Sequence, residues 1–179
     1  VIMPSTLSLA GDDIRLDKLQ VLFGGGTFTA TGLINAGTEI SSKGVQLNIE
    51  NFALPLAKAD GSATPPVVLN GVLNGSGTLR KWNLRASGDL RRGKESAQFA
   101  LNGSGSMDAV SLSQLSIKTA KGGLVGKLNT GWKAPYDIAF DGRLDNFDPS
   151  YFHPHYPSAI NADLKLSVKQ DNDKPWKGA

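Results

Sequence analysis

The sequence predicts an all-β protein, built as an elongated, curved antiparallel meander folded around a hydrophobic groove. Apolar residues alternate with polar or small ones in many segments, and the longest run has Ile160, Ala162, Leu164, Leu166 and Val168 in its alternate places. Alternation with a period of two places such side chains on one face of a strand. No segment shows a comparably strong helical spacing. The recurring pattern therefore predicts one large sheet that is apolar on one side and polar on the other.

Eleven strands are predicted from this alternation, and most of the connections between them are short. The expected turns at 11–13, 24–26, 75–77, 103–105 and 121–123 contain the glycine, serine or aspartate that tight turns favour. Short connections pair successive strands antiparallel, which predicts a meander. The predicted strands are 5–10, 14–23, 26–34, 44–54, 67–75, 78–91, 95–103, 107–119, 122–131, 136–147 and 159–169.

Two connections are longer than the rest. Residues 55–66 are polar and flanked by prolines, which indicates an exposed loop. Residues 148–157 combine prolines with aromatic side chains, which indicates a packed corner.

Short motifs also repeat along the chain. Leu-Asn-Gly-Ser-Gly occurs at 73–77 and at 101–105, and Ile-Glu-Asn-Phe at 49–52 matches Leu-Asp-Asn-Phe at 144–147. Repeated strand units predict an array that grows by adding hairpins along one axis. We therefore expect residues 1–179 to form a single β segment of a longer protein, with repeat-like parts at about 1–66 and 67–179.

The alternation slips by one residue at four places. They lie between Leu16 and Leu19, within 79–82, between Leu112 and Leu115, and within 144–147. A slip of one residue would turn all later side chains to the other face unless a β-bulge or a bend restores the facing. Recurring bulges also curl a sheet, so they favour a sheet that folds its apolar side inward.

The composition is that of a globular protein and excludes several classes of site. The chain is 40% hydrophobic and 20% charged, and it has no cysteine for disulfides or for a cysteine-rich zinc site. No apolar stretch approaches the ~20 residues that span a bilayer, so any membrane anchor or targeting signal is expected outside this segment. A net charge of +3 is too small to indicate nucleic acid as a partner.

Enzymatic and metal-dependent functions find little support, and we expect neither catalytic residues nor a cofactor. His153 and His155 near Asp148 are compatible with zinc ligation, but a proline-rich corner with two surface histidines is the favoured interpretation. The glycine run at 24–29 lacks the lysine of a phosphate-binding loop and precedes a strand, so a hairpin turn is favoured. Residues 171–173 carry two aspartates without the rest of a calcium loop.

A basic cluster follows one predicted hairpin and allows two interpretations. It could bind the phosphates of nucleic acid or lipid headgroups. The other interpretation is a solvated polar surface that guards a strand against unwanted pairing. Its members are Arg80, Lys81, Arg85, Arg91, Arg92 and Lys94.

The aliphatic stripe is the feature long enough to carry a function. Eleven strands at ~4.8 Å spacing make a sheet roughly 50 Å long, and polar neighbours such as Gln98, Lys127 and Lys165 should face away from the stripe. The alternative is the core of an ordinary two-sheet sandwich. The residues predicted to line the groove are Phe99, Leu101, Leu112, Leu115, Ile117, Leu124, Leu128, Ile138, Phe140, Leu164, Leu166 and Val168.

A series of features in a fixed order is strongest over 101–164. The features are the strand with Leu112 and Leu115, then Thr119, the glycine turn at 122–123, Trp132, Asn-Phe-Asp-Pro at 146–149, and Pro154 and Pro157 before a new strand.

In this order and spacing the chain resembles the TamB family, the large periplasmic subunit of the translocation and assembly module, within the AsmA-like group. The resemblance implies a long β-sheet trough (a β-taco) in a protein that spans the periplasm from an inner-membrane anchor towards the outer-membrane protein TamA. It also implies a non-enzymatic role in carrying phospholipids to the outer membrane.

Two other functions stay open. One is a chaperone for the assembly of outer-membrane β-barrels and autotransporters, which would bind nascent strands at a sheet edge. The other is a structural β repeat with a closed, dry core. The isolated segment is expected to self-associate through exposed sheet edges, and nucleic acid is not expected as a partner.

Overall fold

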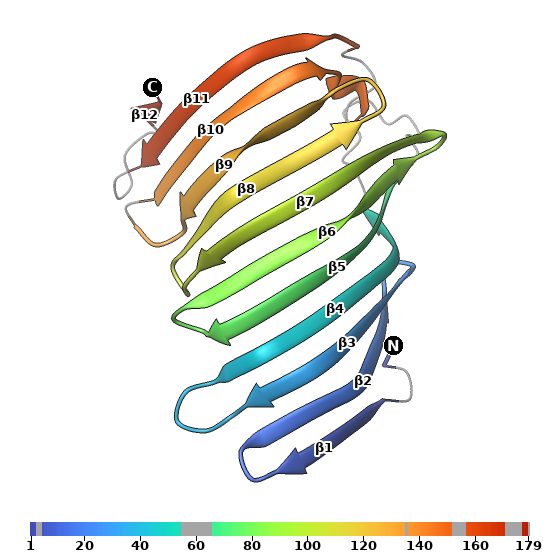
Figure 1. Cartoon of the computed structure of the whole chain (residues 1–179), viewed down its shortest axis with the longest axis vertical. Coiled ribbons are helices and arrows are strands. Elements are labelled where there is room, and N and C mark those ends of the chain that lie inside the picture. Colours follow the sequence, from blue (N-terminus) through green and yellow to red (C-terminus); the bar gives the residue numbers. More distant parts are fainter. Residues whose placement is uncertain (3–4, 55–65, 135, 152–156, 171–176, 179) are drawn as a thin grey trace.

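The chain folds into one antiparallel sheet of twelve strands whose order in space is their order in the sequence. The structure is a computed structural model, and it describes residues 1–2, 5–54, 66–134, 136–151, 157–170 and 177–178. Successive strands pair throughout, so the predicted all-β meander is confirmed. The strands stack along the long axis of the molecule, and the two termini lie at opposite ends of the stack (Figure 1).

The strand boundaries agree closely with the alternation pattern. The largest difference is the start of β6, which begins at Trp82, four residues later than predicted. A short twelfth strand, which was not predicted, pairs with Val168 and Lys169 of β11. The strands are β1 (Thr6–Ala10), β2 (Asp13–Phe23), β3 (Gly26–Asn35), β4 (Ser41–Leu54), β5 (Val67–Thr78), β6 (Trp82–Arg92), β7 (Glu95–Gly105), β8 (Ala109–Thr119), β9 (Gly123–Gly131), β10 (Tyr136–Phe147), β11 (Ile160–Gln170) and β12 (Lys177–Gly178), with one 3-10 turn, η1 (Pro149–Tyr151).

The glycine run that begins at Gly24 forms a hairpin turn and not a phosphate-binding loop, as predicted. β2 ends at Phe23 and β3 begins at Gly26, so Gly24 and Gly25 alone make the loop. Their φ angles are 57° and 76°, the left-handed conformation that both central residues of a type I′ turn require.

The turns predicted at 75–77 and 103–105 are wrong. Both Gly-Ser-Gly segments belong to the ends of strands β5 and β7, and the chain turns only after Thr78 and Ser106. The backbone N–H of Thr78 donates to the carbonyl of Lys81 (2.9 Å). Gly105 is needed for packing across strands, because a Cβ there would collide with the ring of Trp82. The slip predicted within 79–82 is therefore this turn and not a bulge.

The other three predicted slips are bulges, confirmed by shifts in strand pairing at Leu16/Leu19, Leu112/Leu115 and Leu144/Phe147. Ile49/Phe52 is a further shift, in the motif that matches 144–147. These two bulges are built alike.

In each of these two bulges an asparagine lies in the left-handed region, Asn51 at φ 55° and Asn146 at φ 45°. Their backbone N–H groups donate to the side-chain oxygens of Asn70 and Asn161, each at 2.8 Å. The matched motif therefore encodes a bulge that is fastened to the following strand.

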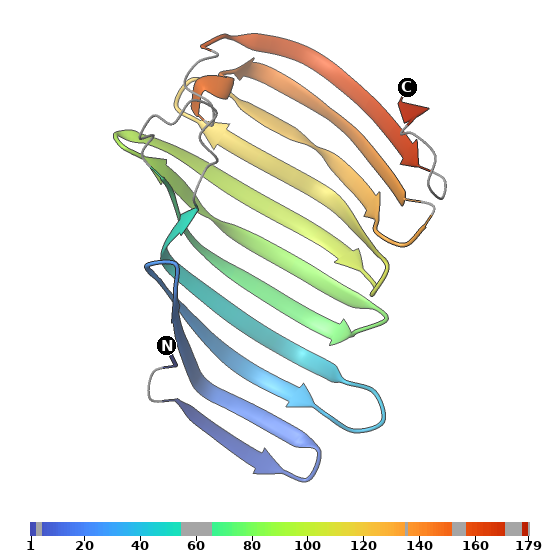
Figure 2. The ribbon, with the colours of Figure 1, turned by 180° about the vertical axis from the view of Figure 1, so that it is seen from behind.

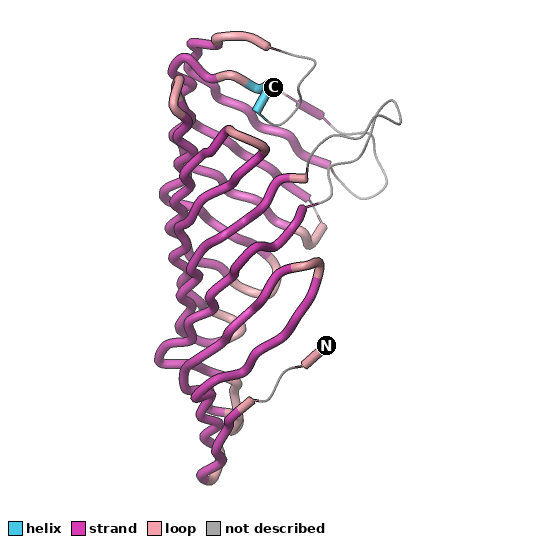
Figure 3. The backbone as a smooth tube through the Cα atoms, turned by 90° about the vertical axis from the view of Figure 1, so that its right-hand side faces the viewer, coloured by secondary structure: helices cyan, strands magenta, loops and turns pink. Residues whose placement is uncertain are grey.

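The sheet is a single curved layer. The extensive contacts between the described strands join sheet neighbours only. No described strand or helix lies across the sheet when it is seen from behind (Figure 2), and its strands bend out of one plane when it is seen from the side (Figure 3). Within the described ranges, the buried apolar side chains are Val67, Ala86, Ala97 and Leu144. The two-sheet sandwich and the closed, dry core are therefore wrong for this part of the chain.

Candidate functional site

Strand pairing places all twelve predicted groove residues on one face of the sheet. Residues directly opposite each other on neighbouring strands point to the same side. We call this surface the apolar face. Its predicted members follow four cross-strand rows, namely Phe99–Ile117–Leu124, Leu101–Leu115–Gly126–Gly142–Leu164, Leu112–Leu128–Phe140–Leu166 and Thr130–Ile138–Val168.

The apolar face continues through the N-terminal half of the sheet. Leu101 lies opposite Ala86, which lies opposite Leu73, and the row then reaches Leu47 and Ala30. The predicted residue set stopped at Phe99. The same period-two alternation in β4 and β5 was the signal that could have extended it.

The apolar face is half-buried and open. Near the C-terminal end of the sheet, Ile138 is 42% exposed and Leu166 is 51% exposed. The polar neighbours lie on the opposite face, as expected: Lys127 and Lys165 both pair with Asp141 of β10. Each strand therefore separates an aliphatic surface from a hydrated one, and the aliphatic surface is not covered by any described element.

Two phenylalanine rings lie flat across glycines of the apolar face. A Cβ built on Gly88 would come within 2.9 Å of the Phe99 ring, and one on Gly71 within 3.1 Å. Phe140 covers Gly126 and Gly142 in the same way, at 2.9 and 2.6 Å. Glycine weakens a strand unless a neighbour fills the space, and here an aromatic ring fills it. The result is a low aromatic surface between the aliphatic side chains.

The opposite face has its own hollow, of about 1120 Å³, lined largely by polar side chains. Four of them, Gln46, Asn74, Arg85 and Asn102, form one cross-strand row. Arg85 Nε donates to Asn102 Oδ1 (3.0 Å), and Asn102 Nδ2 donates to Gln114 Oε1 (2.6 Å). Because Arg85, Asn102 and Gln114 are hydrogen-bonded to one another, we assign these side chains a structural role in stabilising the polar face.

The predicted basic cluster is not one patch. Arg80 and Lys81 lie in the turn at one end of β6, whereas Arg92 and Lys94 lie at its other end. Eleven residues of strand separate these ends by roughly 35 Å. Arg91 Nε pairs with Asp89 Oδ2 at 2.7 Å. Adjacency in the sequence was misleading because an extended strand carries neighbouring charges far apart.

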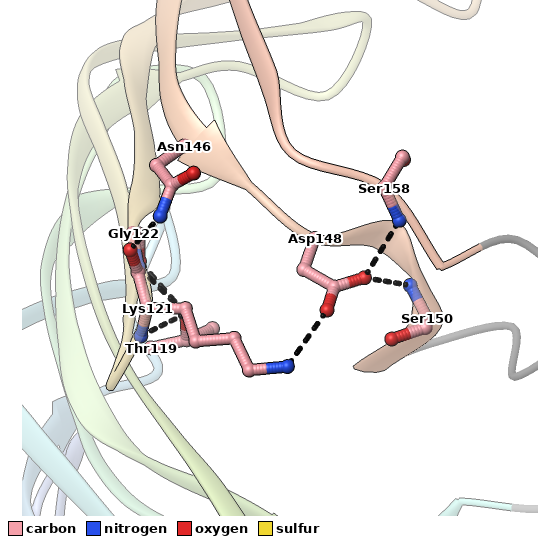
Figure 4. A network of polar contacts seen from close by, with 7 residues as sticks. All are labelled: Thr119, Lys121, Gly122, Asn146, Asp148, Ser150 and Ser158. Carbon is pink, nitrogen blue, oxygen red and sulfur yellow. Dashed lines mark hydrogen bonds and ion pairs between the residues drawn. The ribbon is translucent and has the colours of Figure 1, made fainter.

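A polar network fastens the connection after β10 to the turn between β8 and β9 (Figure 4). Lys121 Nζ lies 3.2 Å from Asp148 Oδ2, and Asn146 Nδ2 donates to the Lys121 carbonyl at 2.6 Å. Thr119 closes the turn, since its hydroxyl oxygen accepts from the backbone N–H of Gly122 at 3.2 Å.

Asp148 is the centre of this network. Its Oδ1 accepts from the backbone N–H groups of Ser150 (3.0 Å) and Ser158 (3.4 Å). Hydrogen bonds from the hydroxyl and the backbone of Ser150, helped by Lys121 and Ser158, hold the pKa of Asp148 well below its ordinary value of 3.8. The fold therefore stabilises the ionised form of the Asp148 carboxylate.

The lowered pKa predicts how stability depends on pH. Asp148 stabilises the fold while it is ionised, so its contribution is complete above about pH 4 and is lost as the pH falls towards the folded-state pKa. We expect Asp148→Asn to lower the melting temperature at pH 7, and we expect its difference from wild type to shrink below about pH 4. Asp141→Asn on the polar face is the control for removing a carboxylate. A difference for Asp148→Asn that stays constant down to about pH 2.5 would contradict the assignment.

Metal binding gains no support from the described residues. No group of three or more histidine, aspartate or glutamate side chains comes together there. His153, His155 and the aspartates of 171–173 lie outside the described residues.

No helix in the described part of the chain is both long and apolar enough to cross a membrane.

No curated protein and no solved structure matches the chain. The family model for the TamB N-terminal domain matches residues 24–179. This match covers most of the sequence, including all strands from β3 to β12, and so the chain belongs to the TamB family.

Proposed function

We propose that this chain is a non-enzymatic segment of a TamB-like protein that holds phospholipid acyl chains on its apolar face and lets them pass along it. The observation that carries the proposal is the continuous apolar face from β3 to β11, made of apolar side chains and ring-covered glycines and left open by every described element. Membership of the TamB family supports a place in the periplasm, in a protein anchored in the inner membrane. A TamA-like outer-membrane protein would then act at regions outside this segment.

The physical basis is the burial of hydrocarbon. Each CH₂ removed from water contributes about 0.8 kcal/mol, so even a partly covered acyl chain is held firmly. Because the apolar rows cross many strands at similar depth, a chain that slides by one strand spacing of ~4.8 Å exchanges one set of contacts for an equivalent set. The total binding free energy of such an acyl chain is large, but it differs little from one position along the face to the next. Movement along the face therefore meets low barriers, as conduction requires.

A chaperone role remains the second candidate, because one sheet edge is free for pairing. β1 has a partner only on its β2 side within the described chain, and Leu9 on it is 69% exposed. An extended segment of a nascent outer-membrane protein could add to such an edge. Lipid and nascent strand would then contact different surfaces of the same sheet.

Site-specific photocrosslinking separates these functions. We expect a photoreactive amino acid at Leu101 or Leu128, on the apolar face, to crosslink phospholipid when the full-length protein is expressed in cells. The same group at Ser116 of β8 or Lys127 of β9, on the polar face, should give little lipid adduct.

The edge strand supplies the contrasting case. Crosslinks to unfolded outer-membrane proteins from Leu9, without lipid adducts at Leu101 or Leu128, would contradict the lipid proposal and favour the chaperone. Equal lipid adducts from both faces would show that the lipid merely coats the protein.

A further inference from the structure

We propose that a cavity at the margin of the apolar face, where strands β6 to β9 turn, binds the headgroup of a zwitterionic phospholipid, a phosphodiester that carries an ammonium group. The inference rests on the proposed function and adds a headgroup preference to it. The cavity has a volume of about 240 Å³. A water molecule needs about 10–15 Å³ of such space, so a headgroup of a few polar groups fits.

Three separate segments of the chain form the cavity. Lys94 comes from the turn between β6 and β7, and Lys121 from the turn between β8 and β9. Asp148 comes from the connection that follows β10 and is fixed by the hydrogen bonds shown in Figure 4. Its side chain is only 14% exposed. The carboxylate wall of the cavity at Asp148 is therefore held in place by the fold itself.

The cavity adjoins the apolar face. Thr119, which lines it, lies opposite Ala97, whose side chain is only 1% exposed. Two residues further along the same strands are Phe99 and Ile117, which pair with each other on the apolar face. Two residues of strand span about 7 Å. A phosphate in the cavity would thus place the ester-linked chains of its own lipid beside the cross-strand row that contains Phe99 and Ile117.

The charges of the cavity match a zwitterion. Lys94 and Lys121 supply two ammonium groups, and Glu95 and Asp148 supply two carboxylates. Lysine binds phosphate as a point charge, and no described residue forms an ion pair with Lys94. Lys121 is already paired with Asp148, at 3.2 Å. A phosphate beside Lys94 and an ammonium group beside Glu95 would complete both pairs, whereas a headgroup with only negative charge would meet the carboxylates.

The test compares ligands that share one acyl chain and differ in the headgroup. We expect the 179-residue protein to bind lysophosphatidylethanolamine about tenfold more tightly than the uncharged monoacylglycerol, and more tightly than lysophosphatidylglycerol. Lys94→Gln combined with Lys121→Gln should remove this tenfold difference and leave monoacylglycerol binding unchanged. Lys94→Gln alone, which breaks no ion pair between described residues, should reduce the difference about threefold.

A matched pair of substitutions controls for net charge. Lys127→Gln combined with Lys165→Gln removes the same charge from the polar face and should change neither affinity. An equal loss in both double variants would overturn the headgroup site in favour of long-range attraction.

The remaining outcomes distinguish the site from the proposed function. If the wild type binds monoacylglycerol and lysophosphatidylethanolamine equally, the headgroup site is wrong while the acyl-chain proposal stands. If it binds neither, both are wrong. If glycerophosphoethanolamine, which has no acyl chain, binds as tightly as the lysolipid, the cavity is a site for free phosphodiesters and its link to the apolar face is refuted.

Discussion

Phe140→Arg should reduce the affinity for phospholipid at least tenfold, and in the full-length protein it should block lipid passage. Phe140 lies in the middle of an apolar row, between Leu128 and Leu166. The substitution removes a ring that covers two glycines and places a charge where acyl chains are proposed to lie. Losing about 1.5 kcal/mol of apolar contact already gives a tenfold change, and the desolvation of the charge adds to it. Leu112→Asp, in the same row, is expected to act alike.

The matched control is Ser167→Arg. Ser167 is exposed on the polar face and lies opposite Ala139, the residue before Phe140. Arginine at position 167 therefore adds the same charge as Phe140→Arg at nearly the same place along the strands, but on the other face. Binding of a fluorescent phospholipid should be normal for this variant. Circular dichroism is the measurement that checks whether each variant is folded. A well-folded Phe140→Arg protein with normal lipid binding and transport would refute the proposed conduit.

Alternation allowed the strands and their faces to be predicted, because a half-exposed sheet must repeat every second residue whatever its partners are. All twelve groove residues chosen from the sequence share one face for this reason. The bulges at Leu16/Leu19 and Leu112/Leu115 were also visible, since a slip in the alternation has to be restored locally if the same face stays apolar.

The ends of β5 and β7 and the polar network could not be predicted, because they depend on partners remote in the sequence. Gly105 looks like a turn residue until the ring of Trp82, on the neighbouring strand, is placed against it. Likewise, Lys121 and Asp148 are separated by 27 residues, and only the paired strands between them bring them together. Glycine marks either a turn or a close contact, and a single sequence does not distinguish the two.

A glycine substitution tests this distinction inside the sheet. We expect Gly88→Ala to lower the free energy of unfolding by about 2–3 kcal/mol, the cost of forcing extra atoms into a packed site. A Cβ at Gly88 would collide with the carbonyl oxygen of Asn70 and come within 2.6 Å of the Cα of Gly71, both parts of the backbone of β5. It would also come within 2.9 Å of the Phe99 ring. The backbone contacts cannot be relieved by a rotamer change, so the two strands must separate.

Gly75→Ala is the matched control for this substitution. Gly75 also lies on the apolar face, opposite Leu84, but the nearest atom to its added Cβ is the carbonyl oxygen of Asn83, at 3.9 Å. Alanine there should be neutral or slightly stabilising, because it restricts the unfolded chain without a clash. Denaturant unfolding of both variants measures the difference, and equal effects would mean that the close approach of β5 and β6 is not what requires glycine.

Adding Phe99→Ala to Gly88→Ala identifies which contact carries the cost. If the ring were the main obstacle, the double variant would recover the stability lost through Gly88→Ala relative to Phe99→Ala alone. We expect recovery of less than about half of it, because the backbone of Asn70 and Gly71 still opposes the new Cβ. Near-complete recovery would instead show that Phe99 alone demands the glycine. The close pairing of β5 and β6 would then be a consequence of the ring lying flat on the apolar face and not its cause.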